Sequence, residues 1–276
     1  MTEIARCGLR QAIGWVLPSI LVLTGELSAE AGALAQVSLV SGGESSLASP
    51  LRDGLWLTVS GCGQRLGQPV GGAHRLRAVD PVSRLVLLEG VAGRAQGLAG
   101  VVAAGASLKD LRNGAAAVVE RRVQLVAGRF LPFTVLEVRM SAAPPGTPLM
   151  DGSGRLAALV SDPAGPGKMY AIPAEVIGRV VDDLIQGGGL RRAKLGFALS
   201  PANEAAKLTR VLPGSPAAGA GMLAGDVLRS INGRPIQGYG DAVHEMFLLK
   251  PGMAAQVTVL RGKVVKEFQL QAVGAE

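Results

Sequence analysis

The sequence predicts a mainly β protein built from two globular units. Its 276 residues are 48% apolar, as in chains with a packed core, and this length suggests two domains of about 100 to 200 residues each. The chain holds 39 glycines and 16 prolines but only 3% aromatic residues. This composition favours short strands separated by many turns and excludes long coiled coils and collagen.

The first unit, residues 36–189, contains short segments rich in Val, Leu and Ala between Gly, Pro or polar turns. This spacing is typical of a β-barrel or a β-sandwich. The strand-like segments are 55–60, 85–88, 118–126, 134–140 and 156–160.

One amphipathic helix closes the first unit. Apolar residues recur at helical spacing over 174–185, Pro173 precedes them, and glycines 187–189 follow. We therefore expect a helix over 174–186 and a domain boundary at about 189. The second unit, residues 190–276, has short strands and two helices, the later one running from near Asp241 to Leu249.

Residues 1–35 have the pattern of an export signal. Arg6 and Arg10 precede an apolar run over 12–25, and small residues at 29–31 and 33–35 fit a cleavage site. The run is shorter than the roughly 20 residues that span a bilayer. We expect a cleaved signal and a periplasmic protein; the alternative is an uncleaved anchor in the inner membrane.

The composition also narrows the range of partners. The net charge is +7, but the basic residues are scattered with few aromatic residues between them, so we expect no nucleic-acid partner. Two cysteines and two histidines make a metal site improbable. We expect neither a metal nor a cofactor.

The second unit carries seven ordered sequence blocks that are similar to those of a PDZ domain of the bacterial HtrA/Deg type. This resemblance implies a partly open β-barrel with two helices. Within the blocks, Gly225-Asp226 and Asn232-Gly233 supply tight turns. The blocks are 195–197 (LGF), 211–218 (VLPGSPAA), 220–222 (AGM), 225–228 (GDVL), 231–233 (ING), 250–252 (KPG) and 259–261 (VLR).

A PDZ domain adds a peptide to a sheet edge as an extra strand and binds its terminal carboxylate with backbone N–H groups. The resemblance places Leu195, Gly196 and Phe197 in the carboxylate loop. Val243 and Phe247, four residues apart on the later helix, are expected to face the groove. For His244 two interpretations stay open, a solvated helix residue, which we favour, and a hydrogen bond to a peptide hydroxyl.

The first unit resembles the trypsin-like protease domain of HtrA proteins, a double β-barrel, but it departs from the family at the catalytic triad. Residues 49–58 (SPLRDGLWLT) are similar to the strand that leads to the catalytic histidine, which falls on Gly61. Residues 80–88 (DPVSRLVLL) are similar to the aspartate segment, with Arg84 at the triad position. Residues 143–149 (APPGTPL) are similar to the nucleophile motif, with Pro145 at the serine position.

These residues supply no nucleophile, no imidazole base and no group to orient it. Proline also lacks the N–H that would donate to the oxyanion. We therefore expect no enzyme activity. A displaced triad drawn from Ser141, Ser153 and His74 is the alternative, although Ser153 falls on a predicted hairpin turn at 151–154.

The leading functional hypothesis is an exported pseudoprotease whose PDZ domain binds C-terminal or extended peptide segments of envelope proteins as an adaptor or regulator. Two alternatives stay open. One is an active HtrA-like serine endopeptidase in periplasmic protein quality control. The other is a regulatory subunit of an active HtrA paralogue.

Overall fold

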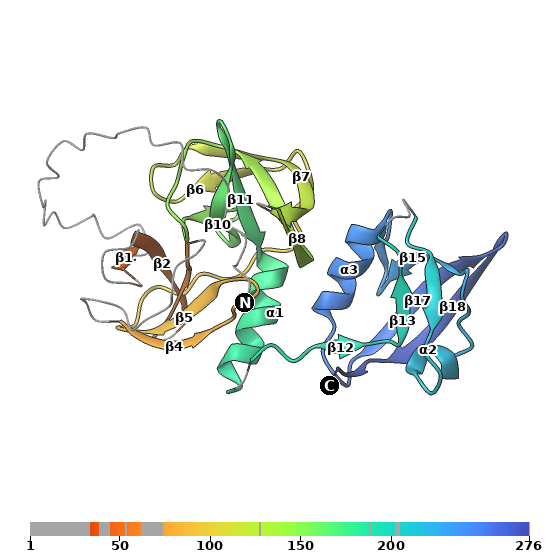
Figure 1. Cartoon of the computed structure of the whole chain (residues 1–276). Helices are drawn as coiled ribbons and strands as arrows, with labels where there is room; N and C mark the ends of the chain where they lie inside the picture. The colour runs from red at the N-terminus through yellow and green to blue at the C-terminus, as the bar shows by residue number, and fades with distance from the viewer. Residues whose placement is uncertain are drawn as a thin grey trace, which may run out of the picture.

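The computed structural model describes residues 34–38, 45–52, 54–61, 74–126, 128–187, 189–201 and 205–275. The predicted export signal at 1–35 therefore lies almost entirely outside the described residues. Within the described ranges, no helix is both long and apolar enough to cross a membrane. Figure 1 shows two lobes, one built from β1 to β11 with α1 and the other from β12 to β19 with α2 and α3.

The first lobe begins with a five-stranded antiparallel sheet in the order β1-β2-β3-β5-β4. Gly54, at a φ of 66°, lies in the turn between β2 and β3, so the segment 49–58, expected as one strand, is divided between two strands of a hairpin. Strand β5, which lies between β3 and β4, is buried on both faces, which accounts for its continuous apolar run. The bounds are β1 (Ala35–Ser38), β2 (Ser45–Arg52), β3 (Leu55–Val59), β4 (Arg75–Val79) and β5 (Leu85–Glu89).

The next six strands form a closed barrel in the order β10-β11-β8-β7-β6-β9. Closure leaves no free sheet edge, and alternate residues fill the interior with small and branched apolar side chains. All the strands predicted in this part of the sequence are present, and β6, β9 and β11 are additional. The bounds are β6 (Ser107–Asp110), β7 (Ala116–Val126), β8 (Arg129–Arg139), β9 (Pro148–Met150), β10 (Leu156–Gly165) and β11 (Lys168–Pro173).

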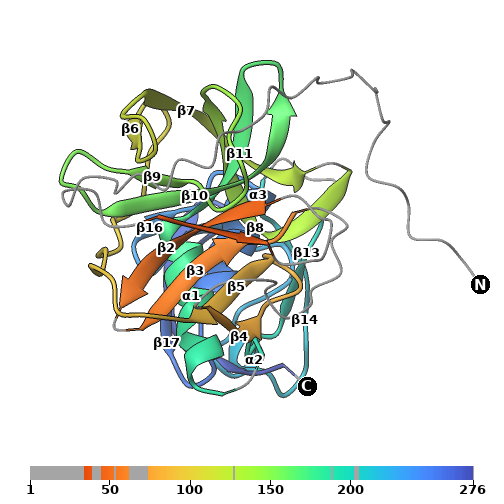
Figure 2. The ribbon, with the colours of Figure 1, turned by 90° about the vertical axis from the view of Figure 1, so that its left-hand side faces the viewer.

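Helix α1 (Ala174–Ile185) confirms the predicted closing helix. Its apolar face includes Val176, Ile177 and Val180, which join one core cluster with side chains from the five-stranded sheet and from the barrel. Figure 2 shows the helix beside the sheet strands. One hydrophobic core therefore unites both halves of the first lobe.

A tight turn at 144–147 connects the two halves through backbone contacts. The N–H of Thr147 donates to the carbonyl of Pro144 at 3.2 Å, and Gly146 has a φ of 81°, as in a type II turn with proline at the second position. The carbonyl of Pro145 accepts from the N–H of Leu47 on β2 at 2.8 Å, and the N–H of Gly146 donates to Val160 on β10 at 2.8 Å. This turn therefore fastens the sheet to the barrel.

The second lobe contains a four-stranded sheet in the order β16-β15-β17-β18 and two small two-stranded sheets, β12-β19 and β13-β14. Asn232 and Gly233 both have positive φ, 51° and 76°, and they form the predicted tight turn between β15 and β16. The bounds are β12 (Ala193–Lys194), β13 (Phe197–Leu199), β14 (Leu208–Val211), α2 (Pro216–Gly219), β15 (Val227–Ile231), β16 (Arg234–Pro235), α3 (Tyr239–Leu248), β17 (Ala254–Arg261), β18 (Val264–Gln271) and β19 (Val273–Gly274).

We predict that Gly146→Ala destabilises the first lobe more than an ordinary glycine substitution. A Cβ at residue 146 would lie 1.9 Å from the carbonyl oxygen of Leu47, so the turn and β2 must separate. We expect a loss of more than about 2 kcal/mol in unfolding free energy, measured with urea.

The matched control is Gly154→Ala, because Gly154 also has a positive φ, 75°, but a Cβ there meets nothing within 4 Å. This variant introduces backbone strain without a steric contact, and we expect it to lower the unfolding free energy by about 1 kcal/mol. Equal losses in the two variants would contradict a role for the contact between the turn and β2.

Candidate functional site

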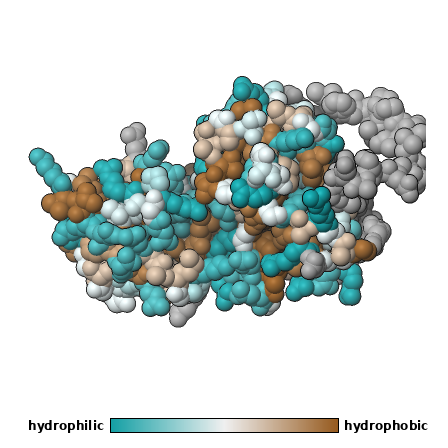
Figure 3. All heavy atoms as spheres, turned by 180° about the vertical axis from the view of Figure 1, so that it is seen from behind, coloured by the Kyte–Doolittle hydropathy of each residue, from teal (hydrophilic) through white to brown (hydrophobic). Residues whose placement is uncertain are grey.

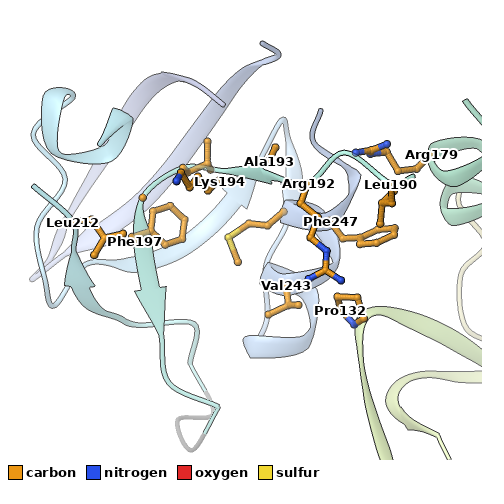
Figure 4. A pocket seen from close by; sticks show the side chains of 13 residues that line it. Pro132, Arg179, Leu190, Arg192, Ala193, Lys194, Phe197, Leu212, Val243 and Phe247 are labelled. Carbon is orange, nitrogen blue, oxygen red and sulfur yellow. The ribbon is translucent and has the colours of Figure 1, made fainter. Parts of the chain in front are cut away.

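An apolar groove of about 250 Å³ lies between β13 and α3. All five residues that the sequence assigns to peptide binding line it, and Figure 4 shows Phe197 and Leu212 on one side and Val243 and Phe247 on the other. The remaining lining residues come from both lobes. The full lining consists of Pro132, Arg179, Leu190, Arg192, Ala193, Lys194, Leu195, Gly196, Phe197, Leu212, Val243, Met246 and Phe247.

The loop at 195–197 contains a glycine in the left-handed backbone region. Gly196 has a φ of 90°, and a Cβ there would lie 2.0 Å from Cβ of Ser215, so only glycine fits. Its carbonyl accepts from the N–H of Leu212 at 2.8 Å and from Oγ of Ser215 at 3.1 Å. In the described part of the chain the N–H groups of Leu195 and Gly196 donate to no acceptor, which leaves them for a ligand carboxylate.

The charged side chains that line the groove are positive. Arg179, Arg192 and Lys194 line it, and none of the described residues in the lining is acidic. Sequence reasoning missed these cations, together with Leu212 and Met246. The position of Met246, three residues after Val243 on the same helix, was the available signal.

His244 does not face the groove, and the favoured interpretation of a solvated histidine is wrong. Its side chain is only 4% exposed because it points from α3 toward the first lobe. The backbone N–H of Thr134 on β8 donates to Nδ1 of His244 at 3.1 Å. Nε2 lies 3.6 Å from Oε1 of Glu175 on α1.

Glu175 is the acidic centre of this contact between the lobes. Oε1 accepts from the guanidinium of Arg122 at 2.6 Å. Burial raises the pKa of Glu175, but the hydrogen bond from His244 and the charge of Arg122 outweigh it and lower the pKa to about 2. The carboxylate is therefore ionised at pH 7.

The structure brings the three triad-position residues to one region between the sheet and the barrel. Gly61 directly follows β3, and the N–H of the preceding Ser60 donates to the carbonyl of Arg84 at 3.0 Å. The Arg84 guanidinium forms an ion pair with Asp162 on β10. Pro145 lies in the turn whose Gly146 N–H donates to Val160 on the same strand.

Arg84 occupies a constrained position in the β4–β5 turn. Its φ is 62°, in the left-handed region that non-glycine residues rarely adopt. Asp80 accepts from the N–H of Ser83 at 2.7 Å and from its Oγ at 2.6 Å. The carbonyl of Asp80 accepts from the N–H of Arg84 at 2.8 Å. These bonds and the pair with Asp162 fix a cation, not a carboxylate, at this place.

The candidates for a displaced triad lie apart from one another. The ring of His74 packs edge-on against Trp56, 4.7 Å between centroids, and burial lowers the pKa of His74. Oγ of Ser153 donates to Asp151 at 2.6 Å on an exposed turn, which lowers the pKa of Asp151 to about 2. Ser141 is exposed after β8. Among the described residues no hydrogen bond joins His74 to either serine.

Comparisons with known proteins agree with this architecture. The family model described as PDZ domain matches residues 193–271. Probable periplasmic serine endoproteases, DegP-like, from Rhizobium meliloti and Pseudomonas fluorescens are 28% and 29% identical over 152 and 163 residues. These matches cover 49% and 53% of this chain but only 30% and 34% of the relatives' lengths.

Solved structures extend the likeness to most of the chain. A serine endoprotease from Yersinia pestis has a TM-score of 0.54 at 19% identity, and an HtrA-type protease, AlgW with tripeptide, has a TM-score of 0.59 at 20% identity. Each comparison covers 89% of this chain and 95% of the other. The two lobes thus define a mainly β protein with the fold of HtrA proteases. The chain contains a PDZ domain and is homologous to DegP-like serine endoproteases of the HtrA type.

We predict that Glu175→Gln lowers the unfolding free energy by about 3 kcal/mol at pH 7, because the folded state loses a paired carboxylate. The pKa of Glu175 is about 2 in the folded state and 4.5 without the interactions. The stabilisation is therefore complete above pH 4.5 and is lost as the pH falls toward 2. Urea unfolding at several pH values measures it.

Glu89→Gln is the control, since Glu89 forms an exposed ion pair with Arg77 and we expect less than about 0.5 kcal/mol at every pH. If the difference between the unaltered protein and Glu175→Gln stayed constant from pH 6 to pH 2.5, the assignment of the ionised carboxylate would be wrong.

Proposed function

We propose that the protein is an HtrA-like pseudoprotease that binds C-terminal or extended peptide segments through its PDZ groove, as an adaptor or regulator. The observation that carries this proposal is the apolar groove beside a glycine loop in which the N–H groups of Leu195 and Gly196 have no acceptor among the described residues. A peptide strand can pair with the exposed edge of β13 while its last side chain enters the apolar groove. Its carboxylate then meets the two N–H groups.

The proposed loss of catalysis rests on the chemistry at three positions. Gly61 has no side chain, Arg84 forms an ion pair with Asp162, and Pro145 has neither a hydroxyl nor an N–H. Acyl transfer needs a nucleophile, a base and an oxyanion donor in one place. In the turn at 144–147 the Thr147 hydroxyl and the N–H groups of Gly146 and Thr147 already donate to backbone carbonyls.

The proposed organisation is an export signal or anchor at 1–35, a trypsin-like unit at 36–189 and a PDZ unit at 190–276. Two DegP-like relatives are named as periplasmic, which supports the periplasm as the location. Segments of envelope proteins are then the available peptide partners. Binding to an active HtrA paralogue, as its regulatory subunit, is the alternative use of the same groove.

A second candidate function is serine endopeptidase activity. It is favoured by the names of the relatives, which are serine endoproteases, and it would need a nucleophile outside the three positions, such as Ser141 or Ser153. Peptide hydrolysis needs an activated serine and peptide binding does not, so the two functions can be tested separately.

We predict that free-acid peptides bind the full chain at least about tenfold more tightly than their C-terminally amidated twins, because charge-assisted hydrogen bonds contribute roughly 1.5 to 3 kcal/mol each. Fluorescence anisotropy with a pool of octapeptides ending in apolar residues measures the difference. Gly196→Ala removes the preference, since its Cβ would displace Ser215.

Gly214→Ala is the matched control for that substitution. Gly214 also has a positive φ, 71°, but its Cβ meets nothing within 4 Å, so peptide binding persists. If the free-acid and the amidated peptides bound with equal affinity, or if neither bound, the groove would not recognise a terminal carboxylate.

We predict that a fluorophosphonate probe labels no serine of the purified protein under conditions in which it labels an active HtrA-type protease. The probe reacts with a serine only when a base activates its hydroxyl. Mass spectrometry of the digested protein is the readout, and a stoichiometric adduct on Ser141 or Ser153 would establish the endopeptidase instead.

A further inference from the structure

Helix α3 is exposed to the peptide groove on one side and buried against the first lobe on the other. Val243 and Met246 line the groove. His244 points the opposite way and is buried. Phe247 serves both sides, because it lines the groove and its ring packs against Phe133 of β8 with 4.8 Å between centroids. The wall of the binding site is therefore also the interface between the lobes, which meet in Figure 3 along a crevice.

The first lobe contacts α3 along its whole length. Near the start of the helix, a Cβ on Gly240 would lie 3.4 Å from the side-chain oxygen of Gln124 on β7. In the middle, His244 accepts the hydrogen bond from Thr134. Phe247 meets Phe133 toward the end. Three separate contacts of this kind fix both the position and the rotation of a helix of ten residues.

Arg179 of α1 fixes the carboxylate end of the groove. Its side chain is 2% exposed and pairs with Asp183 at 2.5 Å. The same guanidinium donates to the carbonyl of Arg191 at 2.5 Å and to that of Leu249 at 3.3 Å. Arg191 leads into the carboxylate loop and Leu249 ends α3, so one cation joins the two chain segments between which a peptide terminus would lie.

The hydrogen bond to His244 selects one form of the ring. The Thr134 N–H is a permanent donor, so Nδ1 must be the acceptor and the ring proton of the neutral imidazole is on Nε2. Nε2 faces the ionised Glu175 at 3.6 Å. The side chain thus bridges β8 and α1 from a position on α3.

We propose that the first lobe is a structural part of the peptide site, because its hydrogen bond to His244 and the bonds from its Arg179 to the chain at Arg191 and Leu249 set the separation of α3 from β13. This inference rests on the proposed function. A groove whose helical wall is already positioned loses less conformational entropy when a peptide enters. The trypsin-like unit then has a use that requires no catalysis, which is to position α3.

The test measures peptide affinity in full-length variants altered away from the groove. His244 is not part of the groove lining, so a groove independent of the first lobe would not respond to its loss. We expect His244→Ala to weaken binding of the free-acid octapeptide pool about tenfold, the effect of one buried hydrogen bond together with its neighbouring contacts. His244→Asn restores affinity to within about twofold, because its Oδ1 can accept from Thr134.

Asp182→Asn is the matched control. Asp182 also contacts the second lobe, through an ion pair with Lys250 at 2.8 Å, but it is half exposed and does not touch α3. We expect its affinity to stay within about twofold of the unaltered protein. The melting temperature of each variant separates a local effect from unfolding.

Hydrogen exchange of the unaltered protein supplies a second readout that needs no variant. Coupling is reciprocal, so a saturating peptide must increase the protection of the Thr134 amide, which lies outside the groove. Unchanged protection, or unchanged affinity in a folded His244→Ala variant, would overturn the proposal while leaving peptide binding intact. If the unaltered chain binds no free-acid peptide, the proposed function itself fails.

Discussion

The structure depends on the burial of two faces of α1. One face, with Val176, Ile177 and Val180, completes the core shared by the sheet and the barrel. The opposite stripe is charged, with Glu175, Arg179 and Asp183 at successive spacings of four residues. Buried charges must be paired. The partners of this stripe come from the linker, from α3 and from β7, and so the pairing requirement itself brings the two lobes together.

The pairing of these buried charges also sets the geometry of the groove. Arg179 reaches both the start of the carboxylate loop and the end of α3, while Glu175 lies opposite the middle of the same helix through His244. Positioning a helix needs packing and hydrogen bonds but no nucleophile, so this role of the first lobe does not depend on catalysis. The cations Arg192 and Lys194 add a positive potential at the groove, which attracts anionic peptide termini.

The region around Arg84 and Pro145 is held by contacts between the sheet and the barrel. The turn at 144–147 fastens β2 to β10 through backbone bonds, and Arg84 joins the β4–β5 turn to β10 through Asp162. Each contact crosses from the sheet to the barrel. Residues in this region therefore stabilise the junction between the two halves of the first lobe.

The sequence by itself determined the features that depend on local chemistry. Apolar spacing predicted helix 174–185, Asn232-Gly233 predicted its turn, and the blocks around 195–197 predicted the loop beside the groove. The burial of His244 and the pairing of Arg179 were decided only by the tertiary structure. Periodicity identifies which face of a helix is apolar, but a polar face has the same pattern whether water or another lobe covers it. Since the covering residues lie tens of positions away along the chain, only the folded arrangement could identify them.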